Sequence, residues 1–499
     1  MKYVSTRDIN ASVKINSADT IKQGIADDGG LFMPCELVKI EYDKLKQMQK
    51  LSYAELARDI LFLYLTDYSP EMLDKIVRKA YSEANFNKSP AVLSKLDDKR
   101  YVLELYHGPT SAFKDMALQI MPLLLSEALN ITGETRNALI LVATSGDTGK
   151  AALEGFKDID KIDIAVFYPK DGVSCIQKLQ MDSQEGNNVT VCSVAGNFDD
   201  CQTGVKNIFN DEEIKSALKE KNIFFSSANS INFGRLIPQV VYYFYAYLEM
   251  VNRGDIEIGE LIDICVPTGN FGNIFAGYAA KEMGLPVDKF ICASNKNDVL
   301  TEFFDKGIYD SNRKFYTTMS PSMDILISSN LERLLYLLAG AKENSIYMAE
   351  LKKEGKYIIS KNIKDKLDKN FIGLSCDEEH TSDTIKKVFD KYNYLIDPHT
   401  AVAFYCAEKY INDNKSGKKM LIVSTASAYK FAGDTYFALT GERVSEDDEI
   451  KSLRMLSEYT KTEIPVPLKE LVNKEIRFNN SVEKDCMKEF VENFVKSKI

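Results

Sequence analysis

Residues 137–150, NALILVATSGDTGK, decide the fold of this chain. The apolar run NALILVA predicts a strand, a loop of glycines and hydroxyl residues follows it, and the next residues, AALEGF, have a helical pattern. A strand that is apolar along its whole length is typical of a parallel sheet covered by helices on both faces. The stretch therefore predicts an α/β fold.

The same pattern recurs along the chain and divides into two sets. Apolar strands are predicted at 101–106, 163–169, 188–194, 261–267, 289–294 and 419–425. The first set ends near residue 235, before a helix predicted at 236–251, and the second set follows that helix. We therefore predict two open, mostly parallel sheets wrapped by helices. The predicted units are an N-terminal extension (1–92), two α/β units (93–240 and 241–445) and a helical tail (446–499).

Composition excludes several classes of protein. The 499 residues carry a net charge of −10, which argues against a nucleic-acid partner, and no apolar run reaches the length of a membrane helix. The N-terminus lacks the apolar core of a signal peptide. Nine scattered cysteines without a CxxC pair and only three histidines favour a reducing cytoplasm and no metal site. A monomer or a homodimer is expected.

One lysine has an unusual position. In HGPTSAFKDMALQ (107–119), Thr110 resembles a helix N-cap, which places Lys114 in the first turn of a helix. The helix dipole disfavours a cation there, and Ala112 and Phe113 add desolvation. Such a lysine either extends to water or is a neutral amine that attacks a carbonyl carbon.

Three strand ends carry loops that suit ligand binding. TSGDTGK (144–150) and PTGNFGN (267–273) each lead into a helix, where free N–H groups can bind an anion. Neither loop is a P-loop or a dinucleotide fingerprint, so a single phosphate group fits better than NAD. STASAYKF (424–431) places hydroxyl groups after the last strand. Each loop alone is also explained by an ordinary turn. Together with a nucleophilic lysine, they are the parts of a pyridoxal-phosphate site.

The chain resembles the threonine synthase family of the long bacterial and fungal type. That family belongs to the fold-type-II pyridoxal-phosphate enzymes, which are relatives of the tryptophan synthase β-subunit. The resemblance rests on motifs that span nearly the whole chain, in this order: YVSTRD, DDGGLFMP, HGPTSAFKDMALQ, ATSGDTG, SSANSINFGRLIPQ, PTGNFGN, DPHTAVA and IVSTASAYKF. It implies pyridoxal 5′-phosphate as cofactor and conversion of O-phospho-L-homoserine and water to L-threonine and phosphate.

The resemblance also implies a role for particular residues. Lys114 is similar to the lysine that forms the Schiff base, and Thr425 to the hydroxyl that bonds the pyridine nitrogen. Three further groups are implied: for the cofactor phosphate Gly269, Asn270, Phe271 and Asn273; for the substrate carboxylate Thr144, Ser145, Asp147 and Thr148; and for the substrate phosphate Asn229, Ser230 and Arg235.

One loop departs from the family pattern. Where the family usually reads TAHPAKF, this chain has Ser427, Ala428 and Tyr429 in place of His-Pro-Ala. Two alternatives stay open beside the main interpretation. A threonine dehydratase or a cysteine synthase-like enzyme would share the lysine and cofactor loops but would need no second phosphate site. A catalytically silent family member would act as a binding or regulatory protein.

Overall fold

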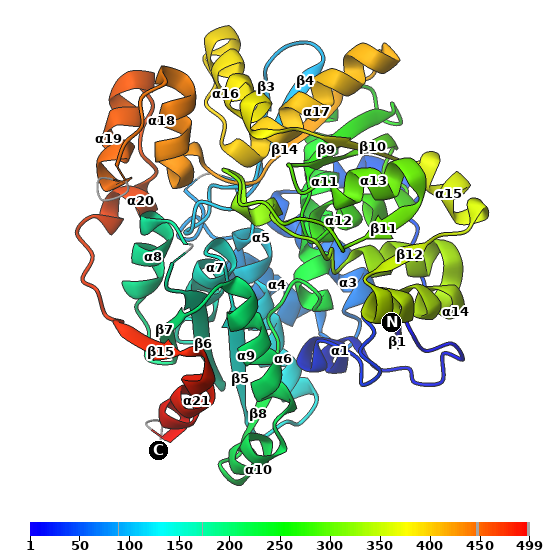
Figure 1. The fold of residues 1–499 in the computed structure, drawn as a ribbon. Coiled ribbons are helices and arrows are strands. Elements are labelled where there is room, and N and C mark those ends of the chain that lie inside the picture. The colour runs from blue at the N-terminus through cyan, green and yellow to red at the C-terminus, as the bar shows by residue number, and fades with distance from the viewer. Residues whose placement is uncertain (88, 172, 446–448, 497–499) are drawn as a thin grey trace.

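Two parallel β-sheets form the framework of the protein in a computed structural model that describes residues 1–87, 89–171, 173–445 and 449–496 (Figure 1). The five-stranded sheet has the order β15-β7-β6-β5-β8, and the six-stranded sheet has the order β13-β10-β9-β14-β4-β3. Within these two sheets, every pair of neighbouring strands is parallel except β3 and β4. The predicted α/β fold with two mostly parallel sheets is confirmed.

The strands have the following bounds. The five-stranded sheet contains β5 (Asn137–Ala143), β6 (Ile162–Pro169), β7 (Val189–Ala195), β8 (Ile223–Ser226) and β15 (Asn480–Glu483). The six-stranded sheet contains β3 (Val92–Lys95), β4 (Arg100–Glu104), β9 (Ile262–Pro267), β10 (Val287–Ser294), β13 (Phe371–Ser375) and β14 (Met420–Ser424). Two antiparallel pairs complete the set: β1 (Tyr3–Ser5) with β2 (Phe32–Pro34), and β11 (Ile308–Asp310) with β12 (Lys356–Ile358).

The central strands of each sheet are buried on both faces, as the apolar strands predict. In β5, Ile140 belongs to the largest hydrophobic cluster, whereas its neighbours Leu139 and Leu141 belong to a second cluster with α9, α10 and α21. In β9, Ile264 and Cys265 point into different clusters in the same way. Successive side chains of a strand alternate between faces.

Helices cover these faces (Figure 1). In the N-terminal region and around the five-stranded sheet they are α1 (Ser17–Gln23), α2 (Tyr42–Met48), α3 (Tyr53–Tyr64), α4 (Pro70–Ala80), α5 (Asp115–Leu118), α6 (Met121–Ile131), α7 (Asp147–Phe156), α8 (Cys175–Asp182), α9 (Phe198–Asn210) and α10 (Glu212–Glu220). The following helices are α11 (Phe233–Asn252), α12 (Gly272–Glu282), α13 (Val299–Lys306), α14 (Leu331–Glu354, broken at Gly340), α15 (Lys361–Asp368), α16 (Glu378–Tyr392) and α17 (Pro398–Asn414). The C-terminal helices are α18 (Ala432–Thr440), α19 (Glu449–Thr460), α20 (Val466–Leu471) and α21 (Met487–Lys496).

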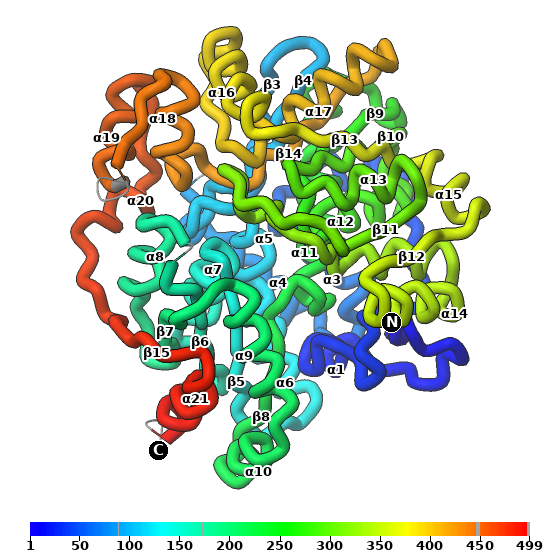
Figure 2. Tube along the Cα trace, in the orientation of Figure 1, coloured from blue at the N-terminus to red at the C-terminus, as the bar shows by residue number. Residues whose placement is uncertain are grey.

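Two strands lie outside the unit expected for them. The strand predicted at 101–106 was grouped with the first set, but β4 pairs with β14 in the six-stranded sheet. The tail expected to be helical also contributes β15, which runs beside β7 at the edge of the five-stranded sheet (Figure 2). An apolar pattern predicts a strand without naming its partner, and the polar sequence of β15 carries no strand signal. The proposed domain boundaries therefore differ from the sheet boundaries.

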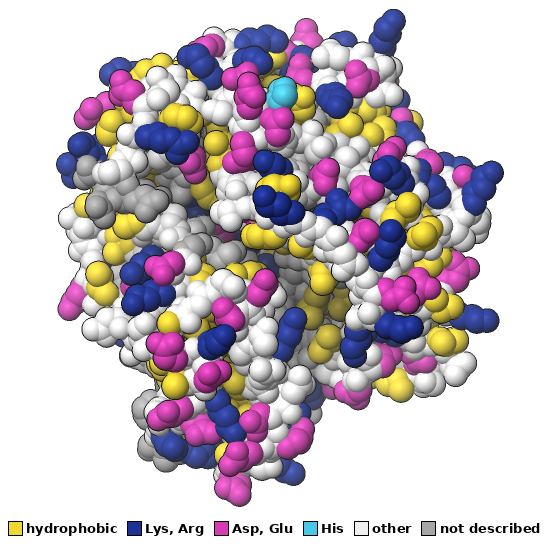
Figure 3. Space-filling view, in the orientation of Figure 1, with side chains coloured by type: hydrophobic (Ala, Val, Ile, Leu, Met, Phe, Trp, Pro, Cys, Tyr) yellow, Lys and Arg dark blue, Asp and Glu magenta, His cyan; other side chains and the backbone are white. Residues whose placement is uncertain are grey.

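The carboxyl ends of β5, β9 and β14 carry the three candidate loops. In Figure 3 the surface is hollowed between the part built on the five-stranded sheet and the part built on the six-stranded sheet. Ligands of open α/β sheets bind beyond the carboxyl ends of the strands. Within the described residues, no helix is long and apolar enough to span a membrane.

Candidate active site

The segment before Lys114 is fastened to the loop after β14. Phe113 donates its backbone N–H to the carbonyl oxygen of Thr425 at 2.8 Å, and Ser427 donates its N–H to the carbonyl oxygen of Ser111 at 3.1 Å. Ser111 has a φ of +57°, which turns the chain into this pairing. Lys114 and Thr425 are thereby brought together from segments far apart in the sequence.

The helix after this segment begins later than the sequence suggests. The expected cap was Thr110, but α5 begins at Asp115 and Lys114 occupies the N-cap position. Asp115 accepts hydrogen bonds from the backbone N–H and the hydroxyl of Thr110, both at 2.8 Å. The buried Asp115 carboxylate therefore holds the turn before α5, a role that the sequence pattern gives to the Thr110 hydroxyl.

Lys114 has the environment of a reactive amine. Its Nζ lies 3.3 Å from the hydroxyl oxygen of Ser322 and 3.9 Å from Oδ2 of Asp147, and it lies over the ring of Phe113. Burial lowers the pKa of Lys114 to about 8; Asp147 opposes this shift, whereas Lys430 and Arg235 add to it. A lysine with a lowered pKa is neutral often enough near pH 7 to act as a nucleophile or a base.

The loop after β9 is shaped to hold an anion. Phe271 has a φ of +64° and stands at the N-cap of α12, with its buried ring against Phe304 and Phe371. The first N–H groups of a helix have no acceptor within the helix, so they are available to a phosphate group. Gly269 is closely packed, since a Cβ there would lie 2.6 Å from the carbonyl oxygen of Ser322.

Asn273 in this loop is oriented by two tyrosines. Its Oδ1 accepts hydrogen bonds from the hydroxyls of Tyr242 at 2.6 Å and Tyr243 at 2.7 Å. These contacts fix the amide so that Nδ2 faces the other way, and this buried donor has no partner among the described residues. Asn270, by contrast, is exposed.

The side chain of Thr144 stabilises the loop after β5. The hydroxyl oxygen of Thr144 accepts the backbone N–H groups of Gly146 and Gly149, both at 2.9 Å. Gly146 has a φ of +134°, a conformation that favours glycine. Ser145 and Thr148 are half-buried at the start of α7, whereas Asp147 is buried. The hydroxyls of Ser145 and Thr148 remain the predicted donors to a carboxylate.

Arg235 is a buried cation. The helix expected from residue 236 begins at Phe233, because Asn232 accepts the N–H of Gly234 and caps α11, so Arg235 lies in the first turn. It is 4% exposed, and one guanidinium nitrogen donates to the carbonyl oxygen of Ala228. Its Nε has no hydrogen-bond partner, and no carboxylate pairs with it, among the described residues.

The other two residues predicted to contact the substrate phosphate precede this helix. Asn229 is exposed, and the hydroxyl of Ser230 accepts a hydrogen bond from Nδ2 of Asn330 at 3.4 Å. Burial lowers the pKa of Arg235 to about 10, which leaves it charged near pH 7. The two neutral residues and the cation thus come from a single stretch, SANSINFGR.

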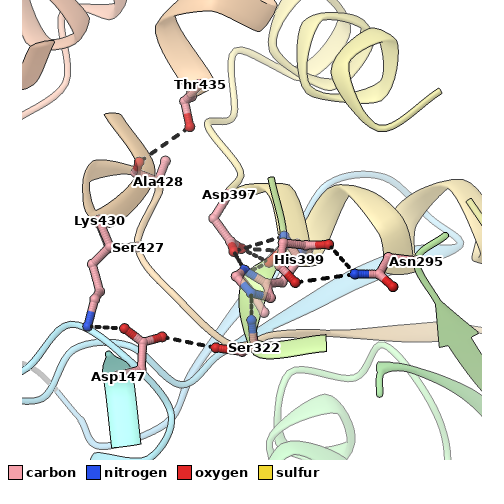
Figure 4. A network of polar contacts seen from close by, with 12 residues as sticks. Asp147, Asn295, Ser322, Asp397, His399, Ser427, Ala428, Lys430 and Thr435 are labelled. Carbon is pink, nitrogen blue, oxygen red and sulfur yellow. Dashed lines mark hydrogen bonds and ion pairs between the residues drawn. The ribbon is translucent and has the colours of Figure 1, made fainter. Parts of the chain in front are cut away.

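Three residues that sequence reasoning missed join this site (Figure 4). Ser322 donates its hydroxyl to Oδ2 of Asp147 at 3.3 Å and its backbone N–H to Nε2 of His399 at 3.1 Å. Lys430 is fully buried, and its Nζ lies 2.7 Å from Oδ1 of Asp147. His399 and Lys430 lay in quoted motifs, DPHTAVA and IVSTASAYKF, but no spacing rule pairs them with Asp147. No motif or spacing in the sequence marks Ser322 as a site residue.

The loop that departs from the family pattern is firmly held. Ser427 accepts the N–H of Tyr429, and the Tyr429 hydroxyl reaches the carbonyl oxygen of Thr462 at 2.9 Å and its hydroxyl at 2.7 Å. The loop is therefore anchored to the segment after α19 in the absence of the usual His-Pro pair.

The residues present fit pyridoxal phosphate. Buried polar atoms without partners among the described residues remain at Asn273 Nδ2, Arg235 Nε and Ser111 Oγ, as expected of a site that receives polar groups from a ligand. The loop at 269–273 would hold the phosphate, Lys114 the aldehyde carbon and Thr425 the ring nitrogen.

Comparisons with known proteins identify the family and its cofactor. The family model described as Threonine synthase N terminus matches residues 2–81, and the one described as Pyridoxal-phosphate dependent enzyme matches residues 77–426. The chain is 39% identical to Threonine synthase-like 1 of Homo sapiens over 92% of this chain and 63% of that relative. It is 37% identical to Threonine synthase of Saccharomyces cerevisiae, over 92% of this chain and 94% of the yeast protein.

A solved structure is also similar over the full length. The crystal structure of PLP-bound threonine synthase from Brucella melitensis matches with a TM-score of 0.87 and 36% identity, covering 100% of this chain and 99% of that one.

The chain spans about 63% of the length of the human relative, so that protein contains sequence with no counterpart here.

Proposed function

Because the chain belongs to the threonine synthase family of pyridoxal-phosphate dependent enzymes, we propose that it converts O-phospho-L-homoserine and water to L-threonine and phosphate. The observation that carries the proposal is Arg235, a buried guanidinium without a carboxylate partner among the described residues. A guanidinium matches the geometry of a phosphate group and can bond it through two nitrogens.

A second phosphate site separates this reaction from others of the same fold. The cofactor phosphate is assigned to the loop at 269–273, so Arg235, Asn229 and Ser230 are left for the phosphate of the substrate. A dehydratase-like lyase, which acts on amino acids without a phosphate group, has no use for this buried cation. We therefore prefer the phosphohomoserine reaction.

The cofactor, when bound, withdraws electrons from the carbon skeleton of an amino acid and so acidifies its C–H bonds. The residues of the chain bind and orient the substrate. The N–H groups and hydroxyls of the loop at 144–148 bind the α-carboxylate, and Arg235 binds the phosphate at the other end. The substrate is then held at both ends, which fixes its Cα beside Lys114.

Lys114 moves the protons. With a pKa of about 8, its amine accepts the proton from Cα and returns it to the same face of the substrate. Lys114 next takes a proton from Cβ, and the electron pair of that C–H bond forms a Cβ–Cγ double bond as the Cγ–O bond breaks and the phosphate leaves. Lys114 returns the proton to Cγ, which becomes the methyl carbon, and water adds its hydroxyl to Cβ and gives its other proton to the released phosphate. Because the phosphate leaves beside Arg235, the cation stabilises the charge that develops on it.

Product analysis tests the proposal. The protein, supplied with pyridoxal phosphate, is incubated with O-phospho-L-homoserine, and threonine and inorganic phosphate are measured together. We expect equal amounts of both, and neither product with Lys114→Ala. Release of a 2-oxoacid and ammonia from threonine or serine, without turnover of phosphohomoserine, would instead support the lyase alternative.

We also propose that the enzyme acts in the cytoplasm. Six cysteines are buried thiols outside any disulfide among the described residues: Cys192, Cys201, Cys265, Cys292, Cys376 and Cys406. A reducing compartment keeps thiols in this state. For the oligomeric state the proposal remains a monomer or a homodimer.

A further inference from the structure

Lys430 connects the two halves of the active site. It lies in the short helix η2 (Ala428–Phe431) after β14 of the six-stranded sheet, whereas its partner Asp147 begins α7, after β5 of the five-stranded sheet. The Lys430 ammonium lies 2.7 Å from Oδ1 of Asp147 and donates to the carbonyl oxygen of Thr110 at 3.0 Å. Figure 4 shows the two side chains pointing toward one another.

Asp147 has more than one partner, and Lys114 is the most distant of them. Oδ1 receives Lys430 and, at 2.9 Å, Nε2 of Gln177, whereas Oδ2 receives the hydroxyl of Ser322 at 3.3 Å. The Lys114 nitrogen lies 3.9 Å from Oδ2 and 3.3 Å from the same Ser322 hydroxyl. The Asp147 carboxylate therefore forms its close ion pair with Lys430. Its shortest connection to Lys114 runs through the hydroxyl of Ser322.

Ser322 is itself held in place. Its backbone N–H donates to Nε2 of His399, so the ring proton is on Nδ1, which donates to Oδ2 of Asp397 at 2.6 Å. Asp397 also accepts the backbone N–H of His399 at 3.0 Å and that of Thr400 at 3.1 Å at the start of α17. This arrangement positions Ser322, whose hydroxyl contacts both Lys114 and Asp147; Figure 4 shows Ser322 beside Asp147 and His399.

We propose that Lys430 is a positioning residue that neutralises Asp147 and so keeps the nitrogen of Lys114 from forming a close ion pair. Without Lys430, Lys114 would be the only cation among the described residues within ion-pair distance of the Asp147 carboxylate, and the attraction would favour the protonated lysine. A protonated amine is neither a nucleophile nor a base.

The pairing has a second consequence for the loop at 144–148. This loop is assigned to the substrate carboxylate, yet Asp147 carries the same charge as that ligand. An unpaired carboxylate would repel the substrate, and Lys430 removes this repulsion. Asp147 accordingly acts as the partner of Lys430, while the N–H groups and hydroxyls of the loop bind the substrate.

The charged groups around Lys114 and Asp147 shift the pKa values of both residues in the directions that this role of Lys430 requires. Burial lowers the pKa of Lys114; Asp147 and Asp115 oppose the shift, and Lys430 and Arg235 add to it. Burial alone would raise the pKa of Asp147, but Lys430 and then Lys114 hold it well below its usual range. Among the described residues, the charged groups that shift the pKa of Lys114 are therefore Asp147, Asp115, Lys430 and Arg235.

Spectroscopic pH titration of the holoenzyme tests the inference, which rests on the proposed role of Lys114. The visible absorption of the bound cofactor changes when the Lys114 nitrogen loses its proton, and the midpoint of that change is the readout. In Lys430→Met we expect the midpoint to rise by about one pH unit or more, because Asp147 then acts on Lys114 alone. In Asp147→Asn we expect it to fall by a similar amount.

The double variant is the matched control. Lys430→Met with Asp147→Asn removes both charges, so the midpoint is expected to return close to the wild-type value. A purely structural role would not produce opposite shifts in the two single variants or their cancellation in the double variant. Circular dichroism checks that each variant is folded.

Three results would overturn the inference. The first is a folded Lys430→Met with the wild-type midpoint, and the second is a shift of the same sign in both single variants. The third is Asp147→Asn with an unchanged midpoint and a raised KM, which would make Asp147 a substrate ligand. If Lys430→Met does not fold, the midpoint of Asp147→Asn alone tests the inference. A wild-type protein without a cofactor band would instead contradict the proposed function.

Discussion

The backbone N–H of Phe113 donates to the carbonyl oxygen of Thr425 at 2.8 Å. This single hydrogen bond joins the residue before the reactive lysine to the residue whose hydroxyl is assigned to the cofactor ring nitrogen. Since both groups must contact the same planar ring, the distance between them has to be fixed by the backbone rather than by mobile side chains. The antiparallel bridge between Ala112 and Ala426 continues this pairing.

The first prediction concerns Lys114. Lys114→Ala should abolish the visible absorption of the bound cofactor and essentially all turnover, because Lys430, the other buried amine described in the site, is held by Asp147 and Thr110. The measurement is borohydride reduction followed by peptide mapping. Lys170→Ala, which removes an exposed lysine directly after β6, serves as control and should keep both properties. A borohydride-reducible link that survives in Lys114→Ala would refute the assignment.

The second prediction concerns pH. Burial lowers the pKa of Lys114 from 10.5 to about 8, so the fraction of neutral amine grows as the pH rises through about 8. The rate at which apoenzyme forms the covalent link with added pyridoxal phosphate should therefore increase with a midpoint near pH 8. Stopped-flow absorbance across a pH series measures it. A midpoint near that of an ordinary lysine would contradict the structure.

The third prediction concerns Thr425, which is 6% exposed. A neutral hydroxyl stabilises a protonated ring nitrogen less than a carboxylate does. Thr425→Asp should therefore raise ring protonation, seen as a change in the cofactor spectrum, and lower turnover by on the order of tenfold or more. Thr425→Ser keeps the hydroxyl and the backbone carbonyl and is the control. Unchanged turnover in Thr425→Asp would remove Thr425 from this role.

Local features of the fold could be predicted from the sequence. The strand predicted at 137–143 is β5 without any change of bounds, and residues Tyr53–Tyr64, whose apolar side chains recur at helical spacing in the sequence, form α3. Both signals lie within the segment itself: continuous apolar residues in the first and helical spacing in the second. The glycine loops were placed correctly at the ends of β5 and β9 for the same reason.

Relationships between distant segments could not be predicted in this way. The sequence predicts a helix from Leu236, whereas the Asn232 side chain caps α11 three residues earlier, at Phe233. The pairing of β4 with β14, and of Lys430 with Asp147, depends on which loops the complete fold brings together. A periodic pattern contains no information about such partners. The assigned roles of the site residues stay predictions until variants are measured.

The fourth prediction is closure on substrate. The loop at 144–148 follows β5 of the five-stranded sheet, and the loop at 269–273 follows β9 of the six-stranded sheet. A ligand that contacts both loops is bound more tightly when they approach, and closure excludes water from the site. Limited proteolysis should show protection when a phosphonate analogue of the substrate is added to the holoenzyme. Identical cleavage with and without the analogue would argue against closure.

The last prediction concerns Arg235, whose guanidinium is buried with an unpartnered Nε. Loss of a charge-assisted contact to the substrate phosphate costs about 2–4 kcal/mol, so Arg235→Ala should lower kcat/KM for phosphohomoserine by roughly 30- to 1000-fold. Cofactor affinity should not change, since the cofactor phosphate is assigned to another loop. Arg253→Ala, at the opposite end of α11, is the control and should keep kcat/KM near wild type. Steady-state kinetics and a cofactor titration on one preparation separate the two effects. A loss explained wholly by cofactor release would move Arg235 out of the substrate site and favour the dehydratase alternative.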